Sequence, residues 1–175
     1  MPAEAWQPPL RLLFVCEGNV CRSPTAELLL GAAVPSAVVR TSSAGVNARV
    51  GDQVAEDTAR LLRAAGVDPT GFVARQLDDA LLAAADLIVV MTAAQRSSVV
   101  RRSPAAMRRA WTLLDLVGTL QQAGLSLVDD PEALLAARTG GFADVPDPWG
   151  RGSGAHRRTF GMVKEAVDRL AASVT

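Results

Sequence analysis

The sequence predicts an α/β fold: a single-domain, three-layer sandwich in which a small central parallel sheet of about four strands lies between helices on both faces. Short, nearly continuous apolar runs are typical of strands that are buried on both faces. These runs alternate with amphipathic stretches of helical spacing, and that alternation predicts a parallel sheet with right-handed crossovers. A length of 175 residues suits one domain with its own core, so we treat residues 1–175 as a single domain.

The first half of the chain supplies two strands and two helices after a flexible N-terminal extension over residues 1–9. The apolar run over 10–15 predicts the first strand. Ser23-Pro24 predicts a helix start, with the hydroxyl as cap and proline at the first helical position, and this helix runs to about Ala33. A second strand follows over 37–43 and ends at Ala44-Gly45. The second helix carries an apolar stripe and closes at Gly66; its stripe consists of Val54, Thr58, Leu61, Leu62 and Ala65.

The second half continues the alternation and ends in an amphipathic helix marked by Phe160, Val163, Val167, Leu170 and Val174. Residues 118–142 are predicted to form one or two short helices joined by loops, and we assign them no function. The remaining predicted elements are a helix over 77–84, a strand over 87–91, a helix over 93–102 and a short strand over 111–114. In parallel sheets, ligands bind beyond the carboxyl ends of the strands, so we expect the functional site at that edge.

The composition excludes several classes of function. The formal net charge is zero, with 18 basic and 18 acidic residues, whereas nucleic-acid-binding domains usually carry a basic excess. No apolar run is long enough to span a membrane, and the first residues lack the pattern of a signal peptide. One histidine and two cysteines make neither a zinc site nor a disulfide framework. We therefore expect no metal or other cofactor, no nucleic-acid partner, no membrane span and a reducing, cytoplasmic setting.

The loop that follows the first predicted strand carries the clearest chemical signal. The apolar run ends at Cys16, and Arg22 stands six positions later, at the start of the predicted helix. A loop between a buried strand and a helix N-terminus turns its backbone N–H groups inward, which forms a site for an anion. Cys16 would face the anion as a thiolate nucleophile, and Arg22 would hold two of its oxygens. A buried core cysteine and a surface arginine are the structural alternatives, although a cation at a helix start is unfavourable without an anion.

Neighbouring residues fit the same interpretation. Gly18 is expected to permit the backbone twist of the loop, and Asn19 tolerates a left-handed conformation and can form hydrogen bonds across it. Ser23 can cap the helix, and its hydroxyl can also donate to the sulfur of Cys16. His156, the single histidine, is expected to be structural or solvated at the start of the last helix.

A thiolate that attacks a phosphate ester needs an acid for the leaving oxygen, and three Asp-Pro pairs are candidates. Asp68 follows a helix stop and is typical of a turn. Asp130 precedes a predicted helix over 132–138, for which it is a suitable N-cap. Asp147 is followed by Pro148-Trp149-Gly150 and a glycine-rich stretch where we expect no helix to cap. We therefore choose Asp147 as the acid, with a plain turn residue as the alternative.

Residues 12–27 resemble the signature of the low-molecular-weight protein tyrosine phosphatase family, whose loop is Cys-x-Gly-Asn-x-Cys-Arg-Ser-Pro. Ser43-Ala-Gly45 and the segment 145–148 resemble two further landmarks of that family, in order. The resemblance implies that Cys16 is the nucleophile, that Arg22 clamps the phosphate, that Asp147 acts as acid and later as base, and that no metal is required. It also implies a phosphate-binding loop of Cys16, Glu17, Gly18, Asn19, Val20, Cys21, Arg22 and Ser23, braced through Asn19, Ser23 and Ser43. Cys21 would form a reversible protective disulfide with Cys16, or merely fill the loop.

Several residues depart from the family pattern. Phe72 stands where a loop-bracing histidine is expected, which predicts a thinner hydrogen-bond network. At the rim of the expected phosphate site, Arg49 stands where relatives often have an aromatic residue. Trp149 is followed by glycine, whereas relatives have a second aromatic residue there. Glu17 adds a carboxylate at the rim, where it either selects positively charged substrates or is simply solvated. Val20 resembles phosphotyrosine-type members, because phosphoarginine-type members tend to have threonine at this position.

The predicted function is hydrolysis of a phosphate monoester, phosphotyrosine on a protein or a small phosphate ester, through a cysteinyl-phosphate intermediate with inorganic phosphate as product. One alternative is an arsenate reductase, because arsenate mimics phosphate in such a loop; without further cysteines after the loop, it would depend on an external thiol. A second alternative is a non-catalytic module that binds phosphorylated ligands. The sequence leaves the physiological substrate and the oligomeric state open.

Overall fold

The computed structural model describes residues 7–141 and 143–174, and its centre is a parallel sheet of four strands in the order β2-β1-β3-β4. The strands are β1 (Leu10–Cys16), β2 (Val39–Gly45), β3 (Leu87–Val90) and β4 (Ala110–Thr112). All three strand pairs are parallel, and Cys16, the last residue of β1, lies opposite Gly45 of β2. Of the predicted N-terminal extension, residues 1–6 lie outside the described residues and 7–9 precede β1 without helix or strand.

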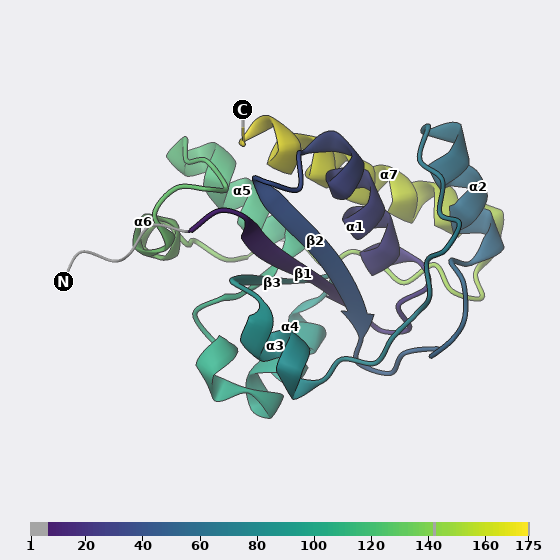
Figure 1. The fold of residues 1–175 in the computed structure, drawn as a ribbon, viewed down its shortest axis with the longest axis horizontal. Helices are drawn as coiled ribbons and strands as arrows, with labels where there is room; N and C mark the ends of the chain where they lie inside the picture. The colour runs from purple at the N-terminus through teal and green to yellow at the C-terminus, as the bar shows by residue number, and fades with distance from the viewer. Residues whose placement is uncertain (1–6, 142, 175) are drawn as a thin grey trace.

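Helices cover both faces of this sheet (Figure 1). One face packs against α1 (Arg22–Ala33), α5 (Leu113–Ala123) and α7 (Gly152–Ala172), and the other against α3 (Asp79–Ala84) and α4 (Ala93–Arg102). Strand β1 shows why: Leu12 and Phe14 belong to the first core, whereas Leu13 and Val15 belong to the second. Successive side chains point to opposite faces of a sheet, so a continuous apolar run fills both cores. The predicted three-layer α/β fold is confirmed.

The strand order places the site. The chain passes from β1 to β2 on one side and later returns to β3 on the other side of β1. The strand order therefore reverses at the carboxyl end of β1, the kind of position at which open α/β sheets bind ligands. The loop 17–21 begins there and leads directly into α1, and α2 (Glu56–Ala64) packs against α7 beside it.

Some predicted boundaries were wrong. Helix α1 starts at Arg22, so Ser23 lies inside its first turn and is not its cap; the N-cap is Cys21, without a side-chain cap. The strand predicted over 111–114 ends at Thr112, whose side chain caps α5 by accepting a hydrogen bond from the N–H of Asp115. Helix α7 starts at Gly152, eight residues before the apolar stripe that predicted it. A short 3-10 helix, η1 (Pro104–Ala106), was not predicted.

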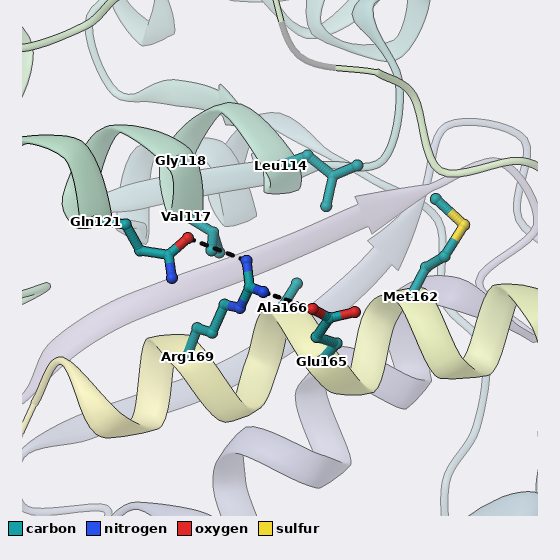
Figure 2. A pocket seen from close by; sticks show the side chains of 8 residues that line it. All are labelled: Leu114, Val117, Gly118, Gln121, Met162, Glu165, Ala166 and Arg169. Carbon is teal, nitrogen blue, oxygen red and sulfur yellow. Dashed lines mark hydrogen bonds and ion pairs between the residues drawn. The ribbon is translucent and has the colours of Figure 1, made fainter.

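The segment 118–142, which has no assigned function, has the predicted helix-and-loop form. It contains the end of α5 and α6 (Pro131–Ala136), and residue 142 lies outside the described residues. Between α5 and α7 lies a hollow of about 270 Å³, where Arg169 contacts both Gln121 and Glu165 (Figure 2). Its lining includes none of the residues 16–23. Within the described ranges, no helix has the length and apolarity that a bilayer crossing requires.

Candidate active site

The loop after β1 turns its carbonyl groups outward. The backbone C=O groups of Cys16, Glu17, Gly18 and Val20 all accept hydrogen bonds from the segment 46–55; the donors are the N–H groups of Val46, Asn47, Arg49 and Ala55, at 2.9–3.0 Å. By contrast, the N–H groups of residues 18–21 find no acceptor among the described residues. A loop whose carbonyls point outward while its amides stay free presents those amides as donors to an anion.

Asn19 holds this loop in shape from within. Its φ of 58° is the left-handed conformation that an asparagine was expected to tolerate here, and its side chain is fully buried. The amide nitrogen donates to the hydroxyls of Ser23 and Ser43, both at 2.9 Å, and its oxygen accepts the backbone N–H of Arg75 at 2.9 Å. Gly18, which was expected to supply the twist, does not have a positive φ, because Asn19 adopts the left-handed conformation instead.

Phe72 does not join this hydrogen-bond network and packs instead against an apolar cluster behind the loop, formed by Val20, Cys21 and Ala74. Asn19 keeps three hydrogen bonds nonetheless, because the backbone of Arg75 occupies its oxygen. The network around Asn19 is therefore well supported without the histidine.

The sulfur of Cys16 lies at the floor of the loop. Cys16 is 2% exposed, and its Sγ lies 2.9 Å from the hydroxyl oxygen of Ser23. Because the Ser23 oxygen already accepts from Asn19, its own proton is available to the sulfur. Of the two roles predicted for this hydroxyl, the contact with the sulfur is therefore present, whereas the cap of α1 is not.

Arg22 ties the loop to a segment more than 120 residues further along the chain. Its side chain is 3% exposed, Nη1 donates to the carbonyl of Val145 at 2.9 Å, and Nη2 lies 3.1 Å from Oδ2 of Asp147. The buried Nε has no partner among the described residues, so the guanidinium keeps at least this donor for a ligand. An arginine buried in this way is not the surface arginine of the structural alternative.

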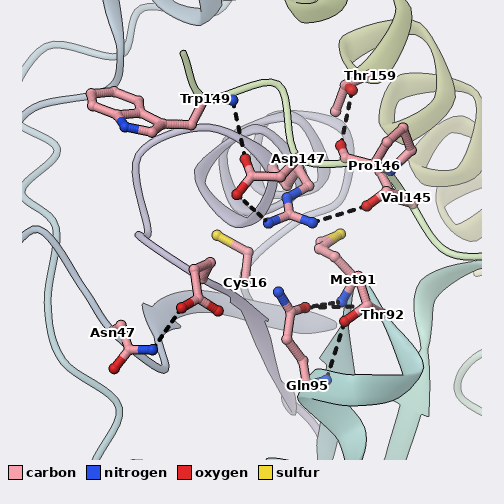
Figure 3. Close-up of polar contacts among 12 residues, drawn as sticks. Cys16, Asn47, Met91, Thr92, Gln95, Val145, Pro146, Asp147, Trp149 and Thr159 are labelled. Atoms are coloured by element: carbon pink, nitrogen blue, oxygen red, sulfur yellow. Dashed lines mark hydrogen bonds and ion pairs between the residues drawn. The ribbon is translucent and has the colours of Figure 1, made fainter. Parts of the chain in front are cut away.

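The segment that carries Asp147 is anchored at the two residues just before the aspartate (Figure 3). The N–H of Val145 donates to the carbonyl of Met91, the residue after β3, at 2.9 Å. The hydroxyl of Thr159 in α7 donates to the carbonyl of Pro146 at 3.0 Å. Asp147 itself is 41% exposed, and its Oδ1 accepts the N–H of Trp149 at 3.2 Å. The carboxylate therefore stands at the pocket mouth on a fixed backbone.

The two rival Asp-Pro pairs have structural partners. Asp130 caps α6 by accepting the N–H of Glu132, and Asp68 accepts the backbone N–H of Thr70 in a turn. Helix α7 follows Asp147 more closely than its apolar stripe indicated, because it begins at Gly152. The choice is unaffected, since the N-cap of α7 is Arg151 and Asp147 does not cap it.

These residues enclose one cavity of about 190 Å³. At its rim, the guanidinium of Arg49 lies 4.5 Å from the ring centre of Trp149 and 2.7 Å from a carboxylate oxygen of Asp52. Glu17 accepts a hydrogen bond of 2.6 Å from Asn47, a rim residue to which the sequence reasoning gave no role. The lining consists of Cys16, Glu17, Gly18, Val20, Cys21, Arg22, Asn47, Arg49, Asp147 and Trp149. The structure thus gathers the predicted loop, acid and rim around one space.

Cys21 differs from Cys16 in its surroundings. Both cysteines are free, and burial raises the pKa of the Cys21 thiol to about 12, against the opposing effect of its hydrogen bond with Thr58. Cys21 is therefore a protonated thiol at neutral pH. The nearby His156 is buried and pairs with the Thr58 hydroxyl at 2.9 Å, which makes it structural. In the described part of the chain, no three His, Cys, Asp or Glu side chains are grouped to hold a metal ion.

Two residues that support the loop were missed. A Cβ on Gly45 would lie 2.5 Å from the carbonyl oxygen of Glu17, so only glycine allows β2 to approach the loop so closely. Glu27 in α1 accepts a hydrogen bond from the hydroxyl of Ser43, the residue that Asn19 also contacts. The Ser43-Ala-Gly45 landmark points to Gly45, but Glu27 is indistinguishable in sequence from a solvated helix residue.

Comparison with known proteins identifies the family. The model of the low molecular weight phosphotyrosine protein phosphatase family matches residues 11–175. The chain belongs to this family. Among the relatives of this phosphatase, the probable low molecular weight protein-tyrosine-phosphatase EpsP of Ralstonia nicotianae is 29% identical over 157 residues, which cover 90% of each chain.

Solved structures agree. The YwlE arginine phosphatase of Geobacillus stearothermophilus superposes with a TM-score of 0.74 at 28% identity, covering 94% of this chain and 92% of that one. The tyrosine phosphatase AmsI of Erwinia amylovora gives 0.73 at 27% identity, covering 93% and 91%. The predicted phosphatase class is confirmed, and the comparisons do not favour arsenate reduction.

Proposed function

We propose that this phosphatase hydrolyses phosphotyrosine on proteins through a phosphate covalently held by Cys16. The observation that supports this most strongly is the convergence of Cys16, Arg22 and Asp147 on one cavity of about 190 Å³. A nucleophile, an anion clamp and an acid are the three groups that the reaction requires. A module that only binds phosphorylated ligands would need neither the sulfur nor the carboxylate.

In the first step, the Cys16 thiolate attacks phosphorus, and the bond between phosphorus and the tyrosyl oxygen breaks. The three remaining phosphoryl oxygens accept hydrogen bonds from the free N–H groups of residues 18–21 and from the guanidinium of Arg22. These donors stabilise the negative charge of the transition state. Asp147, at the mouth, gives its proton to the leaving phenolic oxygen. Tyrosine leaves as a neutral phenol, and the phosphate stays on sulfur.

In the second step, Asp147 takes a proton from water as the water oxygen attacks phosphorus. The bond between sulfur and phosphorus breaks, and the electron pair returns to the sulfur of Cys16. The hydroxyl of Ser23, 2.9 Å from that sulfur, donates to it and makes it a better leaving group. Inorganic phosphate departs. Because the cycle requires a free Cys16, we expect it to run in a reducing compartment such as the cytoplasm.

The rim supports an aromatic substrate. Val20 is one of the residues that line the pocket, and its apolar side chain has no group that could accept a hydrogen bond from a guanidinium. Trp149, 47% exposed beside the pocket, can pack against a phenyl ring. Since one relative is named a protein-arginine-phosphatase, phosphoarginine is the rival substrate to test.

The test compares turnover of a phosphotyrosine peptide, a phosphoarginine peptide and, with added thiol, arsenate, all in the presence of a chelator. We expect phosphotyrosine to be the preferred substrate, no activity in Cys16→Ser, and an added phosphate on Cys16 by mass spectrometry after rapid acid quenching. Preferred turnover of phosphoarginine or of arsenate would overturn the proposed substrate. Undiminished activity in Cys16→Ser would overturn the mechanism.

A further inference from the structure

A partly buried carboxyl group, that of Glu27, stands at the end of a hydrogen-bond chain that leads to the nucleophile. Glu27 lies one turn beyond Ser23 in α1 and does not line the pocket. Its Oε2 accepts the hydroxyl of Ser43, and its backbone carbonyl accepts the hydroxyl of Thr41 at 3.1 Å. The chain continues from Ser43 through Asn19 and Ser23 to the sulfur of Cys16, with 2.9 Å at each of these steps.

The backbone of Arg75 fixes the direction in which Asn19 donates. The side-chain oxygen of Asn19 accepts the backbone N–H of Arg75, so its NH2 group faces the two serines and gives one hydrogen to each. A hydroxyl has a single hydrogen. Ser43 gives its hydrogen to Glu27 and accepts from Asn19. Ser23 accepts from Asn19, and its own hydrogen is free to point at Cys16, which as a thiolate can only accept.

We propose that Glu27 is a positioning residue of the catalytic cycle. As the terminal acceptor of the chain, its carboxylate orients Ser43 and Asn19 so that the hydroxyl of Ser23 donates a hydrogen bond to the sulfur of Cys16. The effect of Glu27 on turnover rests on the proposed function. Its effect on the reactivity of the Cys16 sulfur does not, because the hydrogen bonds run through the loop whatever the substrate is.

The charge of the Glu27 carboxylate depends on the groups around it. Burial raises the pKa of the Glu27 carboxyl, while the hydrogen bond from Ser43 and the charge of Arg75 oppose that rise. Arg75 is the charged group that faces Glu27, and its Nε donates to the backbone carbonyl of Ser43 at 2.8 Å. A carboxyl group in such a setting keeps its charge only with these partners. Removing the acceptor leaves the Ser43 hydroxyl with an unsatisfied proton, which favours reorientation of the whole chain.

The experiment measures how fast iodoacetamide alkylates Cys16 at about pH 6, where only the thiolate form reacts appreciably. Glu27→Leu removes the acceptor, and we expect alkylation to slow by about tenfold or more. Glu27→Gln restores an acceptor oxygen for Ser43 and should recover most of the wild-type rate. The matched control is Thr41→Val, which removes a hydroxyl that donates to the backbone carbonyl of Glu27 and not to its carboxylate; its alkylation rate should stay within about twofold of the wild type.

If Glu27→Leu does not fold, Ser43→Ala breaks the same chain one step later and should slow alkylation similarly. Alkylation of Glu27→Leu or Ser43→Ala at the wild-type rate would overturn the inference, as would equal loss in Glu27→Gln and Glu27→Leu. Turnover of an aryl phosphate is measured in parallel and should fall with the alkylation rate. If the wild type turned over no phosphate ester while Glu27→Leu still slowed alkylation, the proposed function would fail and the role of Glu27 would stand.

Discussion

Replacing Asp147 by asparagine removes the acidic group and leaves the other contacts of the pocket in place. The amide oxygen of the new side chain would still accept the N–H of Trp149, and Arg22 would still donate to the carbonyl of Val145, so the loop should keep its shape. The substitution removes the ion pair between Asp147 and Arg22, in which the carboxylate is 41% exposed. The free energy of unfolding should therefore change by at most about 1 kcal/mol. What disappears is the proton for the leaving oxygen.

The size of the loss follows from the exposure of this group. A positioned general acid accelerates a reaction by about 10²- to 10⁴-fold. Asp147 is 41% exposed, and water can replace it in part, so we expect the lower half of that range. For phosphotyrosine or phenyl phosphate, kcat should fall by about 10²- to 10³-fold, or about 2.7–4 kcal/mol. For an aryl phosphate whose phenol leaves readily as an anion, the fall should stay below about tenfold.

Steady-state kinetics of Asp147→Asn on a series of aryl phosphates, with leaving phenols of increasing pKa, provides the assay. The matched control is Asp130→Ala, which removes the N-cap of α6. It should lower the free energy of unfolding by about 0.5–2 kcal/mol and leave the leaving-group dependence unchanged. Equal losses on all esters in Asp147→Asn, or a steep leaving-group dependence in Asp130→Ala, would refute the assignment of the acid.

Three further predictions concern the surroundings of the loop. Because burial raises the pKa of the Cys21 thiol from 9.0 to about 12, the folded chain keeps a proton that the unfolded chain loses. The free energy of unfolding should therefore fall by up to about 1.4 kcal/mol per pH unit above about pH 9, and it should fall less steeply in Cys21→Ala. Denaturant titrations that gave the same slope against pH for both proteins would be inconsistent with this. In thermal unfolding, Gly45→Ala should cost about 1–3 kcal/mol, because the added Cβ would clash with the carbonyl of Glu17. Gly161→Ala in α7, whose added Cβ would meet nothing within 4 Å outside its own helix backbone, should stabilise the fold by up to about 1 kcal/mol. The opposite order would refute the packing argument. Trp149→Ala should raise the KM for a phosphotyrosine peptide about three- to tenfold with kcat little changed, and an unchanged KM would show that the indole does not contact substrate.

Features that depend on neighbouring residues were predictable. The buried strands are continuous apolar runs, and the order of strands and helices follows from their alternation. The loop from Cys16 to Arg22 is contiguous, so its residue types and spacing alone indicate its shape. The left-handed conformation of Asn19 was expected for the same local reason.

Features that depend on distant residues were not predictable. Of the two roles expected for Ser23, the contact with the Cys16 sulfur is present and the cap of α1 is not, because the folded loop turns this hydroxyl toward Cys16 and Asn19. The start of α7 was hidden by glycines at 150, 152 and 154, which usually indicate a loop. Glu27 was missed because a glutamate in a helix normally faces solvent, and its partner Ser43 comes from a different strand.

The central claim is that the loop amides and Arg22 hold the sulfur of Cys16 as an anion in a phosphate site. The most direct test is the rate of iodoacetamide modification across pH, with and without inorganic phosphate, read out by peptide mass spectrometry so that the buried Cys21 serves as an internal reference. We predict modification of Cys16 at about pH 6 at least tenfold faster than that of a free thiol, whose reference pKa is about 8.5, and protection by phosphate. Modification that follows the free thiol and ignores phosphate would contradict the account.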